Sequence, residues 1–239
     1  RQFQSFNASF TEPWLGGNKP TSITLSGFYS FFTLGANNRR YNEINGDRIL
    51  NIDRSYFQRL GFTAQIGKRL KWPDNYFSVF FETSAQQYTL QNYNQFFFTT
   101  GQAYNLFGKF TLNRRSIDDN IFPSMGSELN FSGQFTPPYS FFNGRDYSGL
   151  KPAERFRFLE YHKWKFSWSY YTGLIGQQRK HKLVLYTKVG FGALGLYNRQ
   201  VGLVPFERFY LGGDPFSTTG VMLGGIDSRE FISLRGYGE

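Results

Sequence analysis

The sequence has no cysteine, only two methionines and only two histidines. The absence of cysteine excludes disulfide scaffolds, thiol catalysis and cysteine-based zinc sites. His162 and His181 have no metal-ligating neighbour at a useful spacing, so we expect no histidine metal site. No glycine-rich loop precedes a helical pattern, which argues against nucleotide chemistry. We therefore predict a protein that is not an enzyme and that holds no cofactor or metal.

Long apolar runs are also absent. No stretch of 18 or more apolar residues occurs, so no transmembrane helix is expected. The chain does not open on the charged, apolar and small-residue pattern of a secretory leader. Aromatic residues are abundant instead: they make up 21 % of the sequence, with 29 Phe and 16 Tyr, although the mean hydropathy is negative. A composition rich in both aromatic and polar residues suits strands that face lipid on one side and water on the other.

Apolar and polar residues alternate with a period of two along much of the chain, which predicts β-strands. In 103–113, Leu106 and Phe110 lie on one face of the predicted strand. Asn105 and Lys109 lie on the opposite face. The eight segments with this pattern are 5–10, 22–31, 55–67, 76–84, 103–113, 127–135, 162–171 and 182–191. No convincing amphipathic helix is found.

The connections between these strands alternate in length. The short links carry Gly, Pro, Asn and Asp and lie at about 14–21, 70–75, 115–126 and 173–181. The longer, polar or aromatic links lie at about 33–54, 87–102, 137–157 and from 192 onward. Short turns at one end and long loops at the other are typical of an outer-membrane β-barrel.

A soluble β-sandwich or lipocalin-like barrel would show the same alternation, because period two does not say which face is inside. Two features favour the membrane. The face opposite the apolar one mixes charged and amide side chains with Phe and Tyr, as a wet lumen tolerates. Aromatic residues also stand near the strand ends, as in an interfacial girdle: Trp14, Tyr29, Tyr56, Trp72, Tyr104 and Tyr170.

The formal net charge of +10 admits two interpretations. One is a phosphate-bearing partner, either nucleic acid or anionic lipid headgroups. The other is a scatter of Lys and Arg over loops and a wet lumen. The compact basic runs each lie beside a turn, which favours the second interpretation: 38–40, 68–71, 113–115 and 177–182.

Two segments stand out from this background. In 110–135, Pro123 restricts one backbone torsion and Gly126 can adopt a positive φ, which predicts a rigid turn between two strands. From Pro205 to the end, a long loop carries Arg, Gly and Tyr together and reads as a tether or plug. An arginine in a lumen would bind a carboxylate in a bidentate manner.

These two segments resemble the barrel of the BamA-type outer-membrane assembly factors, in which periplasmic POTRA repeats precede a sixteen-stranded barrel. The matching hairpin residues are Arg114, Arg115, Asp118, Asp119, Phe122, Pro123 and Gly126. The matching residues of the sixth extracellular loop are Phe209, Tyr210, Gly212, Gly213, Arg235, Gly236 and Tyr237. The sequence departs from the family where 214–233 separates the Gly-Gly element from the Arg-Gly-Tyr element.

The resemblance implies an all-β fold, a transmembrane antiparallel barrel of which about eight strands are present. These would be strands four to eleven of sixteen, so we expect residues 1–239 to be a partial outer-membrane barrel domain. Residues 192–239 would form a long extracellular loop that folds into the lumen. There Arg235 would pair with carboxylates on strands beyond this chain, and the hairpin residues Asp118, Phe122, Pro123 and Gly126 would be structural.

The function implied by the resemblance is the folding and insertion of β-barrel proteins into the outer membrane of a Gram-negative-type bacterium. The implied partners are outer-membrane lipids, client β-barrel proteins, and periplasmic and lipoprotein subunits of an assembly complex, without nucleic acid. Three alternatives stay open: a two-partner-secretion transporter of the same superfamily, a porin or channel, and a soluble nucleic-acid-binding β-protein.

Overall fold

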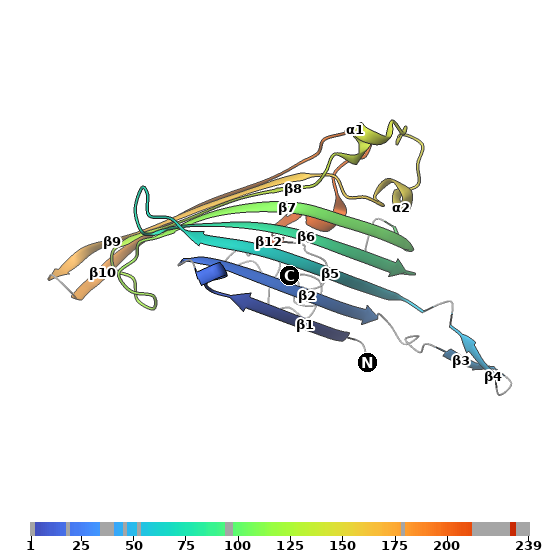
Figure 1. The fold of residues 1–239 in the computed structure, drawn as a ribbon, viewed down its shortest axis with the longest axis horizontal. Coiled ribbons are helices and arrows are strands. Elements are labelled where there is room, and N and C mark those ends of the chain that lie inside the picture. The colour runs from blue at the N-terminus through green and yellow to red at the C-terminus, as the bar shows by residue number, and fades with distance from the viewer. Residues whose placement is uncertain are drawn as a thin grey trace.

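In a computed structural model, the chain is an all-β structure built on one antiparallel sheet of eight strands (Figure 1). The structure describes residues 3–17, 20–33, 41–44, 47–51, 54–93, 98–177, 180–211 and 230–232. The strands of the sheet, in spatial order, are β1 (Phe3–Glu12), β2 (Thr21–Thr33), β5 (Tyr56–Arg69), β6 (Phe77–Gln91), β7 (Gly101–Arg115), β8 (Gly126–Phe135), β9 (His162–Gln177) and β10 (Lys180–Gly195). All eight predicted strands are confirmed.

The remaining elements are short. β3 (Tyr41–Ile44) pairs antiparallel with β4 (Asp47–Leu50), and β11 (Phe209–Leu211) pairs parallel with β12 (Glu230–Ile232). The helices are η1 (Leu15–Gly17), α1 (Tyr139–Asn143), α2 (Pro152–Arg155) and η2 (Pro205–Glu207). In the described part of the chain, none of these helices has the length and apolarity needed to cross a bilayer. Their three to five residues are too few to show a helical period in the sequence.

The sheet has two ends with different connections. The connections after β1, β5, β7 and β9 lie at one end of the sheet, which we call the turn end. The connections after β2, β6, β8 and β10 lie at the other end, which we call the loop end. The predicted alternation of short turns and long loops holds except at one place, because the connection 92–100 after β6 is no longer than the connection 116–125 after β7. The helices α1 and α2 both lie in one long connection, 136–161 (Figure 1).

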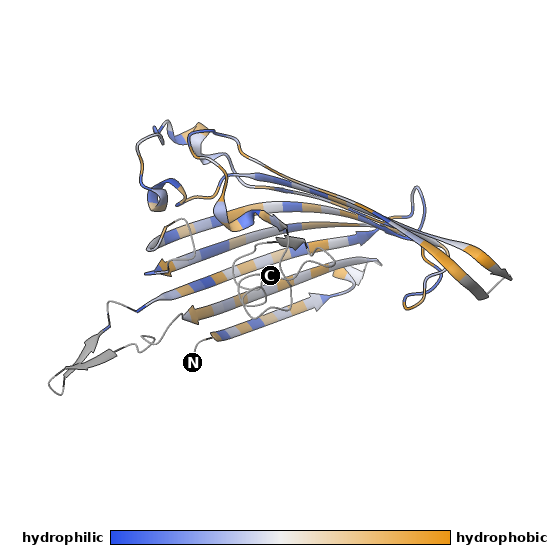
Figure 2. Cartoon of the chain, turned by 180° about the vertical axis from the view of Figure 1, so that it is seen from behind, coloured by the Kyte–Doolittle hydropathy of each residue, from blue (hydrophilic) through white to orange (hydrophobic). Residues whose placement is uncertain are grey.

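The two faces of the sheet differ in composition and in exposure. We call outer the face that carries Phe6, Leu25, Phe62, Phe81, Phe110 and Phe191, all of them exposed. We call inner the face that carries Ser30, Ser84, Gln86, Asn105, Ser132 and Lys163, all of them buried. Along each strand the two kinds of residue alternate, which Figure 2 shows as bands of colour.

This distribution is the reverse of that in a water-soluble sheet. Phe191 on the outer face is 65 % exposed, whereas Asn105 on the inner face is 1 % exposed. Each exposed apolar Å² costs about 25 cal/mol in water, so a sheet-wide apolar surface of this kind requires an apolar environment. The outer face therefore suits contact with lipid acyl chains.

The main apolar cluster lies on the inner face at the loop end, where long connections fold back onto the strands. Phe57 and Tyr88 belong to strands, whereas Leu159 and Phe206 come from the connections after β8 and β10. All four side chains are fully buried. The loops are thus held against the inner face by packing.

One stretch of the long connection after β8 completes the sheet beside β7. β8 pairs only with residues 108–115 of β7, which leaves the loop-end half of β7 without a strand partner on that side. Residues 157–159 take this place: the Tyr104 N–H donates to the Arg157 carbonyl at 2.7 Å, and the Leu159 N–H donates to the Tyr104 carbonyl at 3.0 Å. The bridge between Tyr104 and Phe158 is parallel.

Candidate functional site

The chain that leaves β10 turns back across the inner face and is anchored there within residues 204–209. Val204, Pro205, Phe206 and Glu207 are all buried, as part of η2 and the residue before it. Phe206 stacks on Tyr88 with ring centroids 4.7 Å apart. This segment, residues 204–209, therefore holds the first part of the last long loop against the inner face of the sheet. We call it the inner anchor.

Glu207 is the charged part of the inner anchor. Its Oε2 lies 3.2 Å from Nζ of Lys163 on β9, and the two side chains are 5 % and 2 % exposed. Nδ2 of Asn105 on β7 donates to Oε1 of Glu207 at 3.2 Å. Burial raises the pKa of Glu207 above its ordinary value, and the charge of Lys163 offsets only part of that rise.

Tyr161 extends this polar network toward β8. Its hydroxyl accepts hydrogen bonds from Asn105 Nδ2 at 3.2 Å and from Gln134 Nε2 at 2.5 Å. Burial, and next the negative charge of Glu207, raise the pKa of Tyr161 well above its ordinary value. Each buried polar group of the network thus has a partner, as a stable buried network requires.

Phe209 adds a third contact to the inner anchor. Lys163 Nζ lies 4.8 Å from the centroid of the Phe209 ring, within cation–π range. The same ring lies against Gly192 of β10, where a Cβ atom would come within 2.9 Å of the Phe209 Cζ. A side chain at Gly192 would therefore require the Phe209 ring to shift.

The structure describes only two of the predicted residues of the last long loop. Phe209, the last residue of the inner anchor, and Tyr210 lie in β11. Gly212, Gly213, Arg235, Gly236 and Tyr237 lie outside the described residues, so the predicted path of Arg235 into the lumen stays a prediction. So does the division into a barrel domain, 1–239, and a loop, 192–239.

The second motif, the turn between β7 and β8, is held by Asp118. Its Oδ1 accepts the N–H groups of Ser124 at 2.9 Å and Met125 at 3.1 Å, and its Oδ2 accepts the hydroxyl of Ser124. These hydrogen bonds hold the pKa of Asp118 far below its ordinary value. Asp119 caps the next residues by accepting the Ile121 N–H at 2.7 Å.

Gly126, Phe122 and Pro123 of this turn differ in backbone constraint and in exposure. Gly126 has a φ of +117°, and a Cβ there would lie 2.1 Å from the carbonyl oxygen of Ser116. Phe122 is 83 % exposed, so this aromatic residue does not pack against the wall. Pro123 between them is half-buried. Asp118 and Gly126 are therefore the constrained residues of the motif, and Phe122 is exposed.

Arg114 connects this turn to the neighbouring turn between β5 and β6. Its Nε donates to Oδ2 of Asp74 at 2.9 Å, and its Nη1 donates to the hydroxyls of Ser116 and Ser127 at 2.8 and 2.9 Å. Arg115 pairs across the hairpin with Glu128 at 2.6 Å. The two arginines of the motif thus tie adjacent turns and strands together.

The described residues offer no group of three His, Asp or Glu side chains that could hold a metal ion. His162 accepts a hydrogen bond from Trp164 Nε1 at its Nδ1, 3.1 Å away, and lies against Tyr197. The alternation in the sequence places Asn105 on the polar face of its strand, but it does not indicate that Asn105 or Lys163 is a partner of Glu207. The only sequence signal that pointed to Glu207 was its position in the same segment as the Gly-Gly element.

Comparison with known proteins shows which family the chain belongs to and which solved structure it is similar to. The model of the Omp85 superfamily domain matches residues 2–239. No curated protein matches the sequence. Among solved structures, the chain is similar to the crystal structure of BamA from Haemophilus ducreyi lacking POTRA domains 1–3, with 20 % identity and a TM-score of 0.59. The similarity covers 90 % of this chain and 37 % of that one, so the chain spans little more than a third of its length.

Proposed function

Because the chain belongs to the Omp85 superfamily, we propose that it forms part of an outer-membrane protein that folds and inserts other β-barrel proteins into the outer membrane. The proposed role is not enzymatic. The observation that carries it is the reversed sheet, with exposed aromatic residues outside and buried polar residues inside. Such a wall fits a lipid-facing barrel around a wet interior. The likeness to BamA supports the arrangement of the strands.

In the proposed mechanism, an exposed strand edge of the barrel pairs with the edge of a client strand and so templates its folding. The eight strands described above supply a rigid wall for that reaction. The inner anchor would hold the start of the last long loop, and Arg235 would reach a carboxylate inside the lumen. Client β-barrel proteins, outer-membrane lipids, and periplasmic and lipoprotein subunits are the proposed partners, in a Gram-negative-type bacterium.

The test is depletion of the full-length protein in its own bacterium, followed by measurement of the folded fraction of many outer-membrane proteins by heat-modifiable gel mobility. We expect a general loss of folded barrels. Loss of one secreted protein with normal barrels would favour a two-partner-secretion transporter. Normal barrels, together with a large steady conductance of the purified protein in bilayers, would favour a channel. Either result would refute the assembly role.

A second experiment tests the loop motif. The full-length protein carrying Arg235→Ala should restore barrel assembly less well than the wild type when the normal copy is depleted. The matched control is Arg199→Ala, which removes an exposed arginine from the same connection. Equal restoration by the wild type and both variants would rule out a lumenal tether at Arg235.

A further inference from the structure

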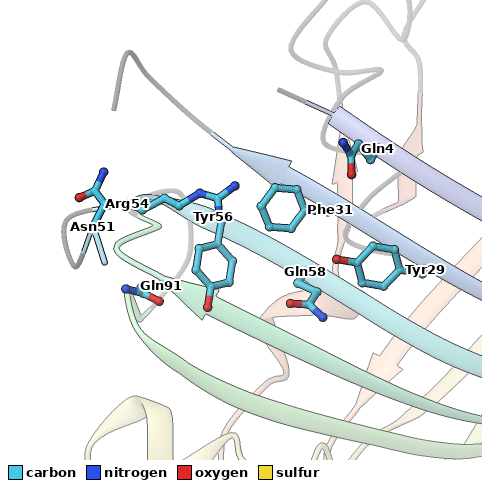
Figure 3. A pocket seen from close by; sticks show the side chains of 8 residues that line it. All are labelled: Gln4, Tyr29, Phe31, Asn51, Arg54, Tyr56, Gln58 and Gln91. Atoms are coloured by element: carbon cyan, nitrogen blue, oxygen red, sulfur yellow. The ribbon is translucent and has the colours of Figure 1, made fainter. Parts of the chain in front are cut away.

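A polar pocket opens on the outer face at the loop end, on the opposite side of the sheet from the inner anchor. Its volume is about 530 Å³. Figure 3 shows the side chain of Arg54 lying over aromatic rings, with amide side chains around it. The lining residues used below are Gln4, Phe31, Arg54, Tyr56, Gln58 and Gln91.

The strand register brings these residues onto one face. Gln4 of β1 is opposite Phe31 of β2, which is opposite Gln58 of β5. Tyr56 of β5 is opposite Gln91 of β6 in the adjacent row. Four neighbouring strands therefore contribute to one floor, and its shape does not depend on a single loop.

Among the described residues that line the pocket, Arg54 is the only one with a charged side chain. Its Cζ lies 4.8 Å from the centroid of Phe31 and 5.8 Å from that of Tyr56, and these two rings are stacked. The aromatic floor thus positions the guanidinium group. Within the described part of the chain, Nε of Arg54 is buried and has no hydrogen-bond partner. A guanidinium group held at a polar pocket can donate charge-assisted hydrogen bonds to the oxygens of an anion.

The surface next to the pocket shows what kind of anion fits. Along β5, the outer face changes from Tyr56 and Gln58 at the pocket to Leu60 and Phe62 farther from the loop end. Leu60 and Phe62 are 50 % and 54 % exposed. A ligand seated here would place a polar headgroup against the amides and Arg54, and apolar chains along the exposed aromatic band. An amphiphile has this shape, whereas a free anion would use only the pocket.

We propose that this pocket binds the phosphate-bearing headgroup of an anionic membrane glycolipid, with Arg54 as the phosphate ligand. The planar guanidinium matches the geometry of a phosphate and can donate two parallel hydrogen bonds. Gln4, Gln58 and Gln91 supply amide donors and acceptors suited to sugar hydroxyls. The proposal rests on the placement of the outer face in a membrane that the proposed function requires.

The test uses the folded full-length protein in zwitterionic phosphatidylcholine nanodiscs that contain a trace of fluorescent, phosphorylated glucosamine-disaccharide lipid. Energy transfer from a labelled protein reports binding. We expect saturable binding that weakens at least tenfold in Arg54→Gln, the size expected for one charge-assisted hydrogen bond. Arg199→Gln, an exposed arginine of another loop, is the matched control and should bind like the wild type.

Three outcomes would overturn the proposal: equal binding of the dephosphorylated lipid, an equal loss in both arginine variants, or displacement of the lipid by millimolar inorganic phosphate. The last would identify a simple anion site. If Arg54→Gln does not fold, Arg54→Lys keeps the charge without the planar fork and should bind more weakly than the wild type. No client protein is present, so the result is independent of assembly activity.

Discussion

Lys163 and Glu207 form a buried ion pair across 44 positions of sequence, with Nζ and Oε2 3.2 Å apart. Removing one partner leaves the other charge buried, so Lys163→Met should lower the free energy of unfolding by about 3–5 kcal/mol. The double variant Lys163→Met/Glu207→Met should cost less than the sum of the two single variants. Urea unfolding in detergent micelles measures this cycle.

The exposed pair Arg145–Glu154, with side chains 53 % and 56 % exposed, is the matched control for that cycle. Its coupling energy should be below about 1 kcal/mol because water screens both charges. Equal coupling energies for the two pairs would contradict a stabilising role for the buried pair in the inner anchor.

Phe206→Ala should detach the inner anchor from the wall. The side chain is fully buried between Tyr88 and Phe98, so its removal should cost about 3–5 kcal/mol of unfolding free energy. Phe122→Ala makes the same chemical change at a side chain that is 83 % exposed, and it should cost less than about 0.5 kcal/mol. Thermal unfolding of both variants in micelles gives the comparison, and similar losses would refute the burial argument.

Gly126→Ala should destabilise the turn between β7 and β8. The new Cβ would meet the Ser116 carbonyl at 2.1 Å, and the φ of +117° is unfavourable for alanine. We expect a loss of about 2 kcal/mol or more. Gly149→Ala is the control, because a Cβ there meets nothing within 4 Å. Unfolding midpoints that shift equally for the two variants would show that Gly126 is not constrained.

Asp118 should make the stability of the same turn depend on pH. Its pKa is lower in the folded state than the ordinary value of 3.8, so its stabilising effect is present above that value and is lost as pH falls through the lowered pKa. Asp118→Ala should therefore be less stable than the wild type at pH 7, with a smaller difference at pH 3. Melting temperatures at the two pH values measure it, and a constant difference would argue against a carboxylate role.

Much of the wall could be predicted from sequence because period-two alternation is a local signal. Leu106 and Asn105 were placed on opposite faces by position alone, and the register confirms this. The alternation could not show which face lies outside, because a soluble sheet has the same period. Burial decided it: the loops cover Asn105 and leave the Phe110 face exposed.

The parts that sequence reasoning missed depend on distant contacts. Nothing near Glu207 in the chain indicates that Lys163 is its partner, since the pairing exists only once β9 and the last loop are brought together. The hairpin of β3 and β4 was missed for another reason. Its signal, the Asn-Gly pair at 45–46, was present within a segment that was interpreted as a long loop.

The hydrogen bonds of residues 157–159 make one part of the connection between β8 and β9 less tolerant of sequence change than the rest. Because these residues hydrogen-bond to Tyr104, their backbone cannot be shifted by an insertion without leaving amide groups of β7 unpaired. Residues 144–149 of the same connection are mostly exposed and carry no such bond to the sheet. Apart from Tyr147, which is buried in the apolar cluster, sequence changes should therefore accumulate around 144–149 and stop short of 157.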